Sequence, residues 1–170
     1  MNLTVELLQE HSKKQALKIA GYIGDNPERF KQLINIFLNS EYRLTQRAAW
    51  VVSICAEKNP ALLKPYLANI IYNLSTTQVP AVKRNTLRLL QHQTIPADLQ
   101  GQLVDTCFTY LTTTEPIAVK AFSLTILANL IKSEPDLKNE LRLVLADILP
   151  YASPGLLSRA QKILPLLQNK

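Results

Sequence analysis

Lysine and arginine recur at fixed positions in this chain, and their side chains are the most evident candidates for ligand binding. Four segments that begin at Lys13, Gln46, Lys83 and Lys120 align without gaps. Basic residues occupy two neighbouring columns of the alignment, interrupted once in each column, by Gln46 and by Ala121. Other basic residues lie four positions apart, which places them on one face of a helix. We call this set the basic stripe. It comprises Lys14, Arg43, Arg47, Lys83, Arg84, Arg88 and Lys120.

The basic stripe has two interpretations that can coexist. It lies away from the apolar columns of the same alignment, so we expect it to be exposed. As an exposed band it would bind an acidic protein partner or, less favoured, a nucleic acid. Alternatively, each basic side chain bonds to the backbone or a carboxylate of the adjacent segment and forms an internal ladder.

The distribution of charge favours a ligand on the N-terminal half. The chain carries 19 Lys and Arg against 13 Asp and Glu, a formal charge of +6. Up to Ile95 the count is 12 basic against 6 acidic residues, and from Pro96 onward it is 7 against 7. All the excess positive charge therefore lies before Pro96.

Patterns that indicate an enzyme or a metal site are missing from the sequence. It has no G-x-S-x-G, no P-loop, no C-x-x-C and no H-E-x-x-H, and only four glycines and two histidines. We therefore expect no catalytic residue, no metal, no cofactor and no small-molecule substrate. Cys55 and Cys107 sit in helical apolar patterns, so we expect two buried free thiols.

Two series of prolines indicate the elements that position the basic stripe. Proline suits the first turn of a helix, where its missing N–H has no partner to lose. A period in the high thirties with two helices per repeat is typical of an α-solenoid. One series is Pro27, Pro60, Pro96 and Pro135, and the other is Pro80, Pro116 and Pro154.

Apolar columns in the aligned segments predict the core. Ile19, Val52, Leu89 and Ile126 share one column. A second column holds leucine except for Trp50, which predicts that this single tryptophan packs in the core. Its other members are Leu17, Leu87 and Leu124.

The starts of the aligned segments resemble HEAT-type helical repeats. The segments Ala81-Val82-Lys83-Arg84 and Ala118-Val119-Lys120-Ala121 carry the resemblance, with Thr45-Gln46-Arg47-Ala48-Ala49 at the same position. The whole chain is also similar to small bacterial HEAT-repeat proteins. The resemblance implies an all-α fold, a right-handed α-α superhelix of about nine or ten helices in antiparallel pairs. We expect one HEAT-like domain over residues 1–170, with a partial helix over residues 3–10 capping the stack.

The same resemblance favours a non-enzymatic binding or scaffold protein over two alternatives. Helical-repeat alkylpurine DNA glycosylases use a basic concave face, aromatic residues and a catalytic aspartate. Here Asp98 and Asp105 fall on a first helix instead of the basic stripe, and one tryptophan is present. A HEAT-like lyase accessory protein acting on tetrapyrroles finds no supporting residue.

The location of the protein is predicted from what its sequence lacks. No apolar run reaches the roughly 18 residues that a membrane-spanning helix needs. The first residues, MNLTVELLQEHSKKQ, have no hydrophobic region of a signal peptide. We therefore expect a cytoplasmic protein that does not bind membranes.

Overall fold

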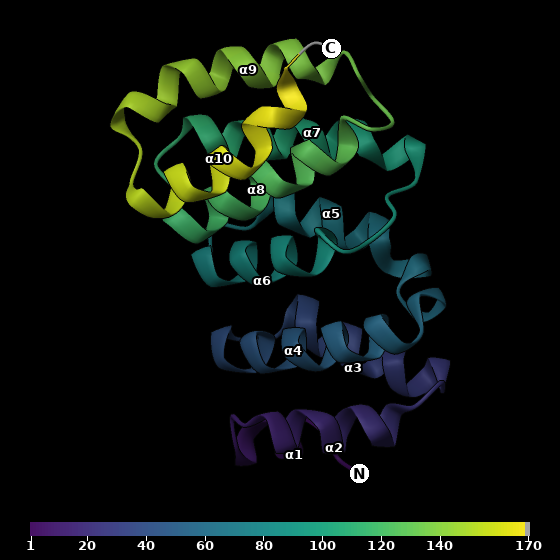
Figure 1. Ribbon diagram of the computed structural model, residues 1–170. Coiled ribbons are helices and arrows are strands. Elements are labelled where there is room, and N and C mark those ends of the chain that lie inside the picture. The colour runs from purple at the N-terminus through teal and green to yellow at the C-terminus, as the bar shows by residue number, and fades with distance from the viewer. Residues whose placement is uncertain (169–170) are drawn as a thin grey trace. The chain divides into compact units, whose positions relative to one another are not determined.

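The computed structural model describes residues 1–168, which form helices and short connections (Figure 1). Residues 169 and 170, part of the expected 1–170 domain, lie outside the described residues. No strand occurs in residues 1–168, which confirms the predicted all-α class. The same residues form ten α-helices, in agreement with the predicted nine or ten. The α-helices are α1 (Leu3–Gln9), α2 (Lys13–Ile23), α3 (Pro27–Asn39), α4 (Tyr42–Lys58), α5 (Leu67–Thr76), α6 (Pro80–Leu90), α7 (Ala97–Thr112), α8 (Ile117–Leu130), α9 (Leu137–Ile148) and α10 (Pro154–Leu167).

The helices pack into two compact units, one over Met1–Leu89 and one from Leu90 onward. In the first unit α3 packs on α4, α2 on α4, and α1 on α2 and α3. In the second unit α7 packs on α8, α8 on α10, and α9 on α7 and α10. Each unit therefore pairs consecutive helices and stacks second helices on second helices, the packing expected of helical repeats. None of the described helices is long and apolar enough to cross a membrane.

Prolines stand at the starts of five helices, at the predicted places. Pro27, Pro80 and Pro154 are the first residues of α3, α6 and α10. Pro96 and Pro116 lie one position earlier, as the N-caps of α7 and α8. The fixed backbone angle of proline suits both positions, and neither costs an intrahelical hydrogen bond.

The helix expected from Pro60 begins later than the sequence predicts. The structure has short 3-10 helices over Pro60–Leu62 and Lys64–Tyr66, and α5 starts only at Leu67. Pro65 explains the delay, because it has no N–H to donate to Ala61 and its ring clashes with that carbonyl in an α-helix. Similarly, α9 begins two residues after Pro135.

The apolar columns form the core with two exceptions, Leu17 and Trp50. Ile19, Val52, Leu89 and Ile126 are all buried, as predicted. In the other column Leu87 and Leu124 are buried, but Leu17 is 43% exposed and Trp50 is only half-buried. The prediction that Trp50 is a core residue is therefore wrong, because in α2 and α4 this column lies at the edge of the core.

Both cysteines are buried free thiols, as predicted. Burial raises the pKa of Cys55 to about 11 and that of Cys107 to about 12. Neither sulfur is a thiolate at neutral pH, so neither thiol is a ready nucleophile.

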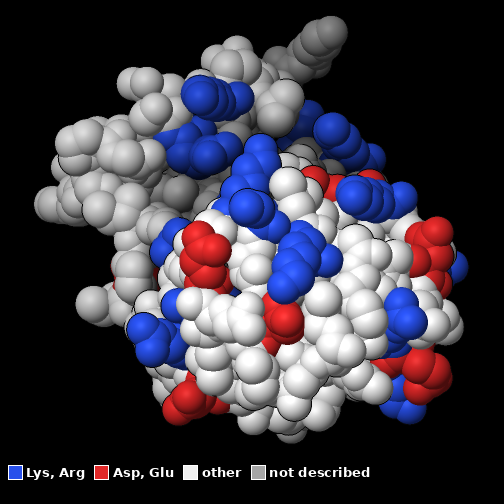
Figure 2. All heavy atoms as spheres, turned by 90° about the horizontal axis from the view of Figure 1, so that it is seen from below, with Lys and Arg blue, Asp and Glu red and all other residues white. Residues whose placement is uncertain are grey.

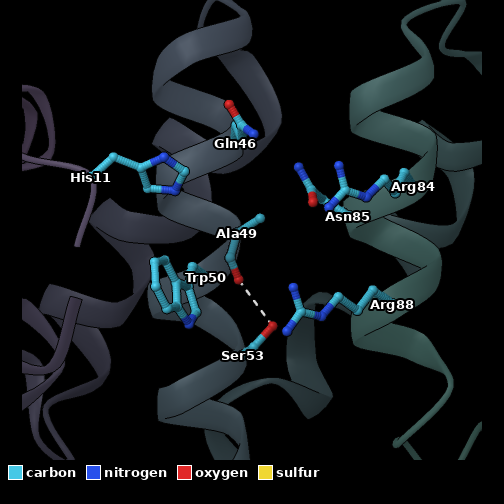
Figure 3. A pocket seen from close by; sticks show the side chains of 8 residues that line it. All are labelled: His11, Gln46, Ala49, Trp50, Ser53, Arg84, Asn85 and Arg88. Carbon is cyan, nitrogen blue, oxygen red and sulfur yellow. Dashed lines mark hydrogen bonds between the residues drawn. The ribbon is translucent and has the colours of Figure 1, made fainter. Parts of the chain in front are cut away.

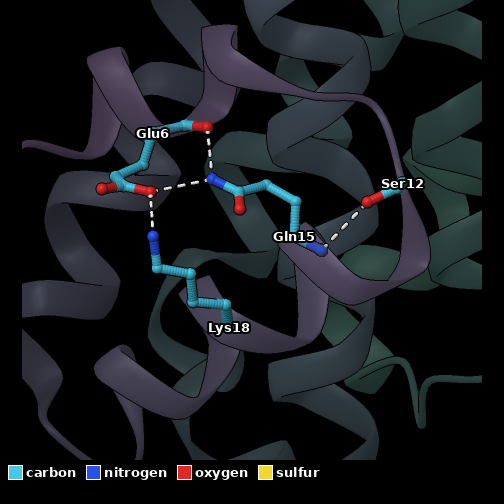
Figure 4. A network of polar contacts seen from close by, with 4 residues as sticks. All are labelled: Glu6, Ser12, Gln15 and Lys18. Carbon is cyan, nitrogen blue, oxygen red and sulfur yellow. Dashed lines mark hydrogen bonds and ion pairs between the residues drawn. The ribbon is translucent and has the colours of Figure 1, made fainter.

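A polar network at one carboxylate joins α1 to α2 (Figure 4). Gln15 Nε2 donates to the backbone oxygen and to Oε2 of Glu6, both at 2.8 Å. Lys18 Nζ lies 2.8 Å from the same Oε2, and Ser12 Oγ caps α2 by accepting from Gln15 N at 3.1 Å. The hydrogen bonds from Lys18 and Gln15 lower the pKa of Glu6 below its ordinary value of 4.5.

The lowered pKa of Glu6 predicts how acid affects the N-terminal helix. A carboxyl group whose pKa is depressed by folding stabilises the protein above its unfolded pKa, and the stabilisation is lost as pH falls through the folded pKa. Glu6→Gln should therefore lower the melting temperature at neutral pH, and the difference from wild type should shrink below pH 4.5. Thermal unfolding over this pH range, with the exposed Glu10→Gln as control, measures the effect. A difference that stays constant with pH would contradict it.

Candidate functional site

The structure divides the basic stripe into two groups. Lys14, Arg43, Arg84 and Arg88 are exposed, as predicted. Arg47 and Lys120 are half-buried and Lys83 is buried. The expectation that the whole stripe is exposed is therefore wrong for the second group, whose members are Arg47, Lys83 and Lys120.

Arg47 and Lys120 hydrogen-bond the ends of neighbouring helices. Arg47 Nη1 donates to the backbone oxygen of Leu7 at 2.7 Å, and Lys120 Nζ donates to that of Leu111 at 3.0 Å. Leu7 and Leu111 lie in the last turns of α1 and α7, where backbone carbonyls lack intrahelical partners. A positive side chain there also complements the negative end of the helix dipole. The interpretation as a ladder between repeats therefore holds for Arg47, which reaches the preceding helix pair, whereas Lys120 bonds within its own pair, α7 and α8.

Arg29, which is not part of the basic stripe, has the same role at the end of α2. Its Nη1 donates to the backbone oxygen of Tyr22 at 2.6 Å, and its guanidinium carbon lies 4.2 Å from the centre of the Tyr22 ring. The position of Arg29 on a first helix hid it from the alignment of second helices.

Among the residues of the basic stripe, Lys83 departs most from the expected exposure to solvent. Only 6% of the residue is exposed, and it takes part in an interaction of its own. It aligns with Lys120, whose side chain is also drawn inward, whereas Lys13 in the same column is exposed. A lysine buried in this way is not available to a ligand.

Two of the exposed arginines line a hollow in the first unit (Figure 3). The hollow has a volume of about 230 Å³ and lies between α4 and α6. Arg84, Asn85 and Arg88 project from α6 toward α4, with Arg88 pointing toward Ser53. The lining residues are His11, Gln46, Ala49, Trp50, Ser53, Arg84, Asn85 and Arg88.

Helical spacing explains why these side chains meet. On α4, Gln46, Trp50 and Ser53 are four and three residues apart and share one face. Arg43 lies one turn before Gln46 on that face. The facing helix α6 presents Arg84 and Arg88, also four residues apart. The pattern of side chains on both walls is therefore fixed by the helices themselves.

Donors predominate on the walls of the hollow. The lining includes no Asp or Glu. Within residues 1–168, Arg84 and Arg88 make no hydrogen bond or ion pair, and Asn85 Nδ2 is buried without an acceptor. Ser53 Oγ is already engaged, since it donates to the backbone oxygen of Ala49 at 3.0 Å. The hollow therefore suits an anionic ligand.

An aromatic contact closes one side of the hollow. The rings of His11 and Trp50 meet edge to face, with centres 5.5 Å apart and planes at 85°. His11 comes from the link between α1 and α2, so three separate parts of the first unit contribute to the lining. The sequence analysis gave no role to His11, Gln46 or Asn85, because each lacks a motif and only packing brings them together.

Side chains that could bind a metal ion do not gather in the described part of the chain. No three of the His, Cys, Asp and Glu side chains in residues 1–168 gather where they could hold a metal ion. Asp98 and Asp105 are exposed on α7, in the second unit, while the unpaired arginines belong to the first. The aspartates are thus on a first helix, as expected.

Removing the hydrogen bond from Arg47 should destabilise the protein. Arg47→Met keeps the aliphatic stem but leaves the Leu7 carbonyl without its donor, at a cost of about 1–3 kcal/mol. Arg43→Met, one turn away on α4 and exposed, should change the free energy of unfolding by less than about 0.5 kcal/mol. Urea denaturation followed by circular dichroism measures both variants. Equal midpoints for the two would show that Arg47 does not stabilise α1.

Comparison with known proteins agrees with the packing of helix pairs. No curated protein and no solved structure matches the chain. A family model described as the HEAT repeat domain matches residues 3–166. The chain, with its stacked helix pairs and its basic residues at the starts of second helices, therefore belongs to the HEAT repeat family.

Proposed function

We propose that this protein is a non-enzymatic binding module whose first unit, Met1–Leu89, receives an acidic segment of a partner protein in the cytoplasm. HEAT repeats generally mediate protein–protein interactions, and the family is typically a non-enzymatic scaffold. The observation that carries the acidic partner is the unpaired state of Arg84 and Arg88 above a hollow without any acidic side chain. The four exposed residues of the basic stripe make the contact surface: Lys14, Arg43, Arg84 and Arg88.

A preformed surface favours this function. The arginines stand on regular helices, and the α4 wall of the hollow belongs to a helix packed on α2 and α3. Little conformational entropy is lost when a rigid surface binds, so a modest number of contacts suffices. Charged residues at such a surface mainly increase the association rate and select the partner.

Nucleic acid is the less favoured ligand. A duplex presents one negative charge about every 1.7 Å, so a nucleic-acid groove needs a continuous track of cations. On the face shown in Figure 2, Lys and Arg side chains are interspersed with Asp and Glu. Arg47, Lys83 and Lys120 are also withdrawn toward the protein, which shortens any such track.

Binding to poly-L-glutamate at low salt tests the proposal. Wild type should bind poly-L-glutamate, bind poly-L-lysine no better than an uncharged polymer, and lose affinity as added salt shortens the screening length to below about 8–10 Å. A variant with Gln at Lys14, Arg43, Arg84 and Arg88 should remain helical by circular dichroism and lose the binding. Arg142→Gln, an exposed arginine on α9 in the second unit, is the matched control and should bind as wild type does.

The outcomes separate the ligand classes. Undetectable binding of poly-L-glutamate at low salt, or binding unchanged in the four-residue variant, would overturn the proposal. Duplex DNA of equal total charge, bound more tightly than poly-L-glutamate with a steep dependence on salt, would favour the nucleic-acid alternative.

A further inference from the structure

The hollow between α4 and α6 has the size of a subsite for one side chain. Its volume is about 230 Å³, whereas a cavity that just holds one water molecule has about 10–15 Å³ on the same measure. The hollow therefore has room for the end of a side chain. It lies within the first unit, so its walls do not depend on the second.

The polar groups in the hollow are arranged for an incoming acceptor. Arg84 and Arg88 each offer a planar fork of donors, the geometry that pairs with a carboxylate through two parallel hydrogen bonds. Asn85 Nδ2 is cut off from solvent and has no acceptor within the described residues. A buried amide donor without a partner is unusual in native proteins, and a rotation of the Asn85 side chain toward the hollow would bring Nδ2 to an incoming acceptor.

Trp50 supplies the apolar part of the same subsite. Its ring forms one wall, and the edge of the His11 ring rests against it at 5.5 Å between centres. The aligned residues Leu87 and Leu124 are buried, so packing explains leucine there but does not require an indole at the rim of a hollow. An aromatic face beside two arginines suits the methylene groups that precede a carboxylate.

We infer that this hollow binds the carboxylate of a single glutamate side chain from the partner, held by Arg84 and Arg88 and hydrogen-bonded by Asn85 Nδ2, with its methylene groups against Trp50. This inference rests on the proposed function, since it names the group that the acidic segment inserts. A guanidinium fork pairs bidentately with a carboxylate or with a phosphate, so a phosphorylated side chain is the competing ligand that the test must include. Arg47, which would supply a third cation, is bound to Leu7 O.

The single tryptophan makes the subsite observable. Trp50 is the only tryptophan in the chain, so its fluorescence reports on the hollow alone. The probes are two pools of synthetic heptapeptides with varied flanking residues and a central Glu or a central Gln. The Glu pool should shift the emission of Trp50, and the Gln pool should not.

Variants assign the effect to named donors. Arg84→Gln and Arg88→Gln should each weaken binding of the Glu pool about tenfold, which corresponds to the loss of one charge-assisted pairing. Asn85→Leu should weaken it by a smaller factor, because it removes a neutral donor. Arg142→Gln should have no effect. The altered arginines are exposed, and equal melting temperatures will show that the variants remain folded.

The results distinguish failure of the subsite from failure of the proposed function. Equal binding of the two pools, no effect of the arginine variants, or tighter binding of a pool with central phosphoserine would each overturn the glutamate subsite. Poly-L-glutamate binding that persists without any change at Trp50 would also overturn the subsite, while leaving the acidic-partner function standing. If neither poly-L-glutamate nor the Glu pool binds, both proposals fail.

Discussion

A single pair of short helices cannot bury its apolar faces, and this constraint shapes the rest of the structure. Second helices must stack on second helices, as α2 does on α4 and α8 does on α10. The stacking keeps residues such as Ile19, Val52 and Ile126 out of water at equivalent positions. Because one face of each second helix is committed to the stack, polar residues are confined to the remaining faces and to the helix ends.

The helix ends explain why so much positive charge is structural. A chain that folds into many short helices has many helix ends, and each C-terminal end leaves carbonyls without intrahelical donors. Arg29, Arg47 and Lys120 reach these carbonyls from a neighbouring helix. The excess of lysine and arginine in the first half therefore overstates the charge that a partner could meet. A count of lysine and arginine could not reveal this, because it does not distinguish exposed side chains from those that cap helix ends.

Repeating features of the sequence predicted the fold well, and local exceptions set the limits. The proline series located the starts of α3, α6 and α10, because an α-helix tolerates proline in its first turn and not in its interior. The series failed at Pro60, since a second proline five residues later prevents an α-helix there. The alignment also placed Trp50 in the core, although its column lies at the edge of the core in α2 and α4. An alignment of repeats gives the face of a helix but not the depth of packing over it.

The candidate site was predictable only in part for a related reason. Arg84 and Arg88 could be identified from their spacing, whereas His11, Gln46 and Asn85 join them only through packing of three separate segments. The residues that line the hollow all belong to the first unit, Met1–Leu89. The sequence predicts a single domain over residues 1–170, and this stays a prediction, because a division into two compact units does not test it.

Two arginines from one alignment column differ in whether they bond to the rest of the protein. Arg47 and Arg84 occupy equivalent positions at the start of second helices, yet Arg47 donates to Leu7 O and Arg84 has no partner among the described residues. If the column served the fold alone, both side chains would be expected to bond to the helix before them. Arg84 instead lines the hollow together with Arg88, where no carboxylate is present. Under the proposed function, the acidic ligand supplies the negative charge that offsets the repulsion between these two like charges.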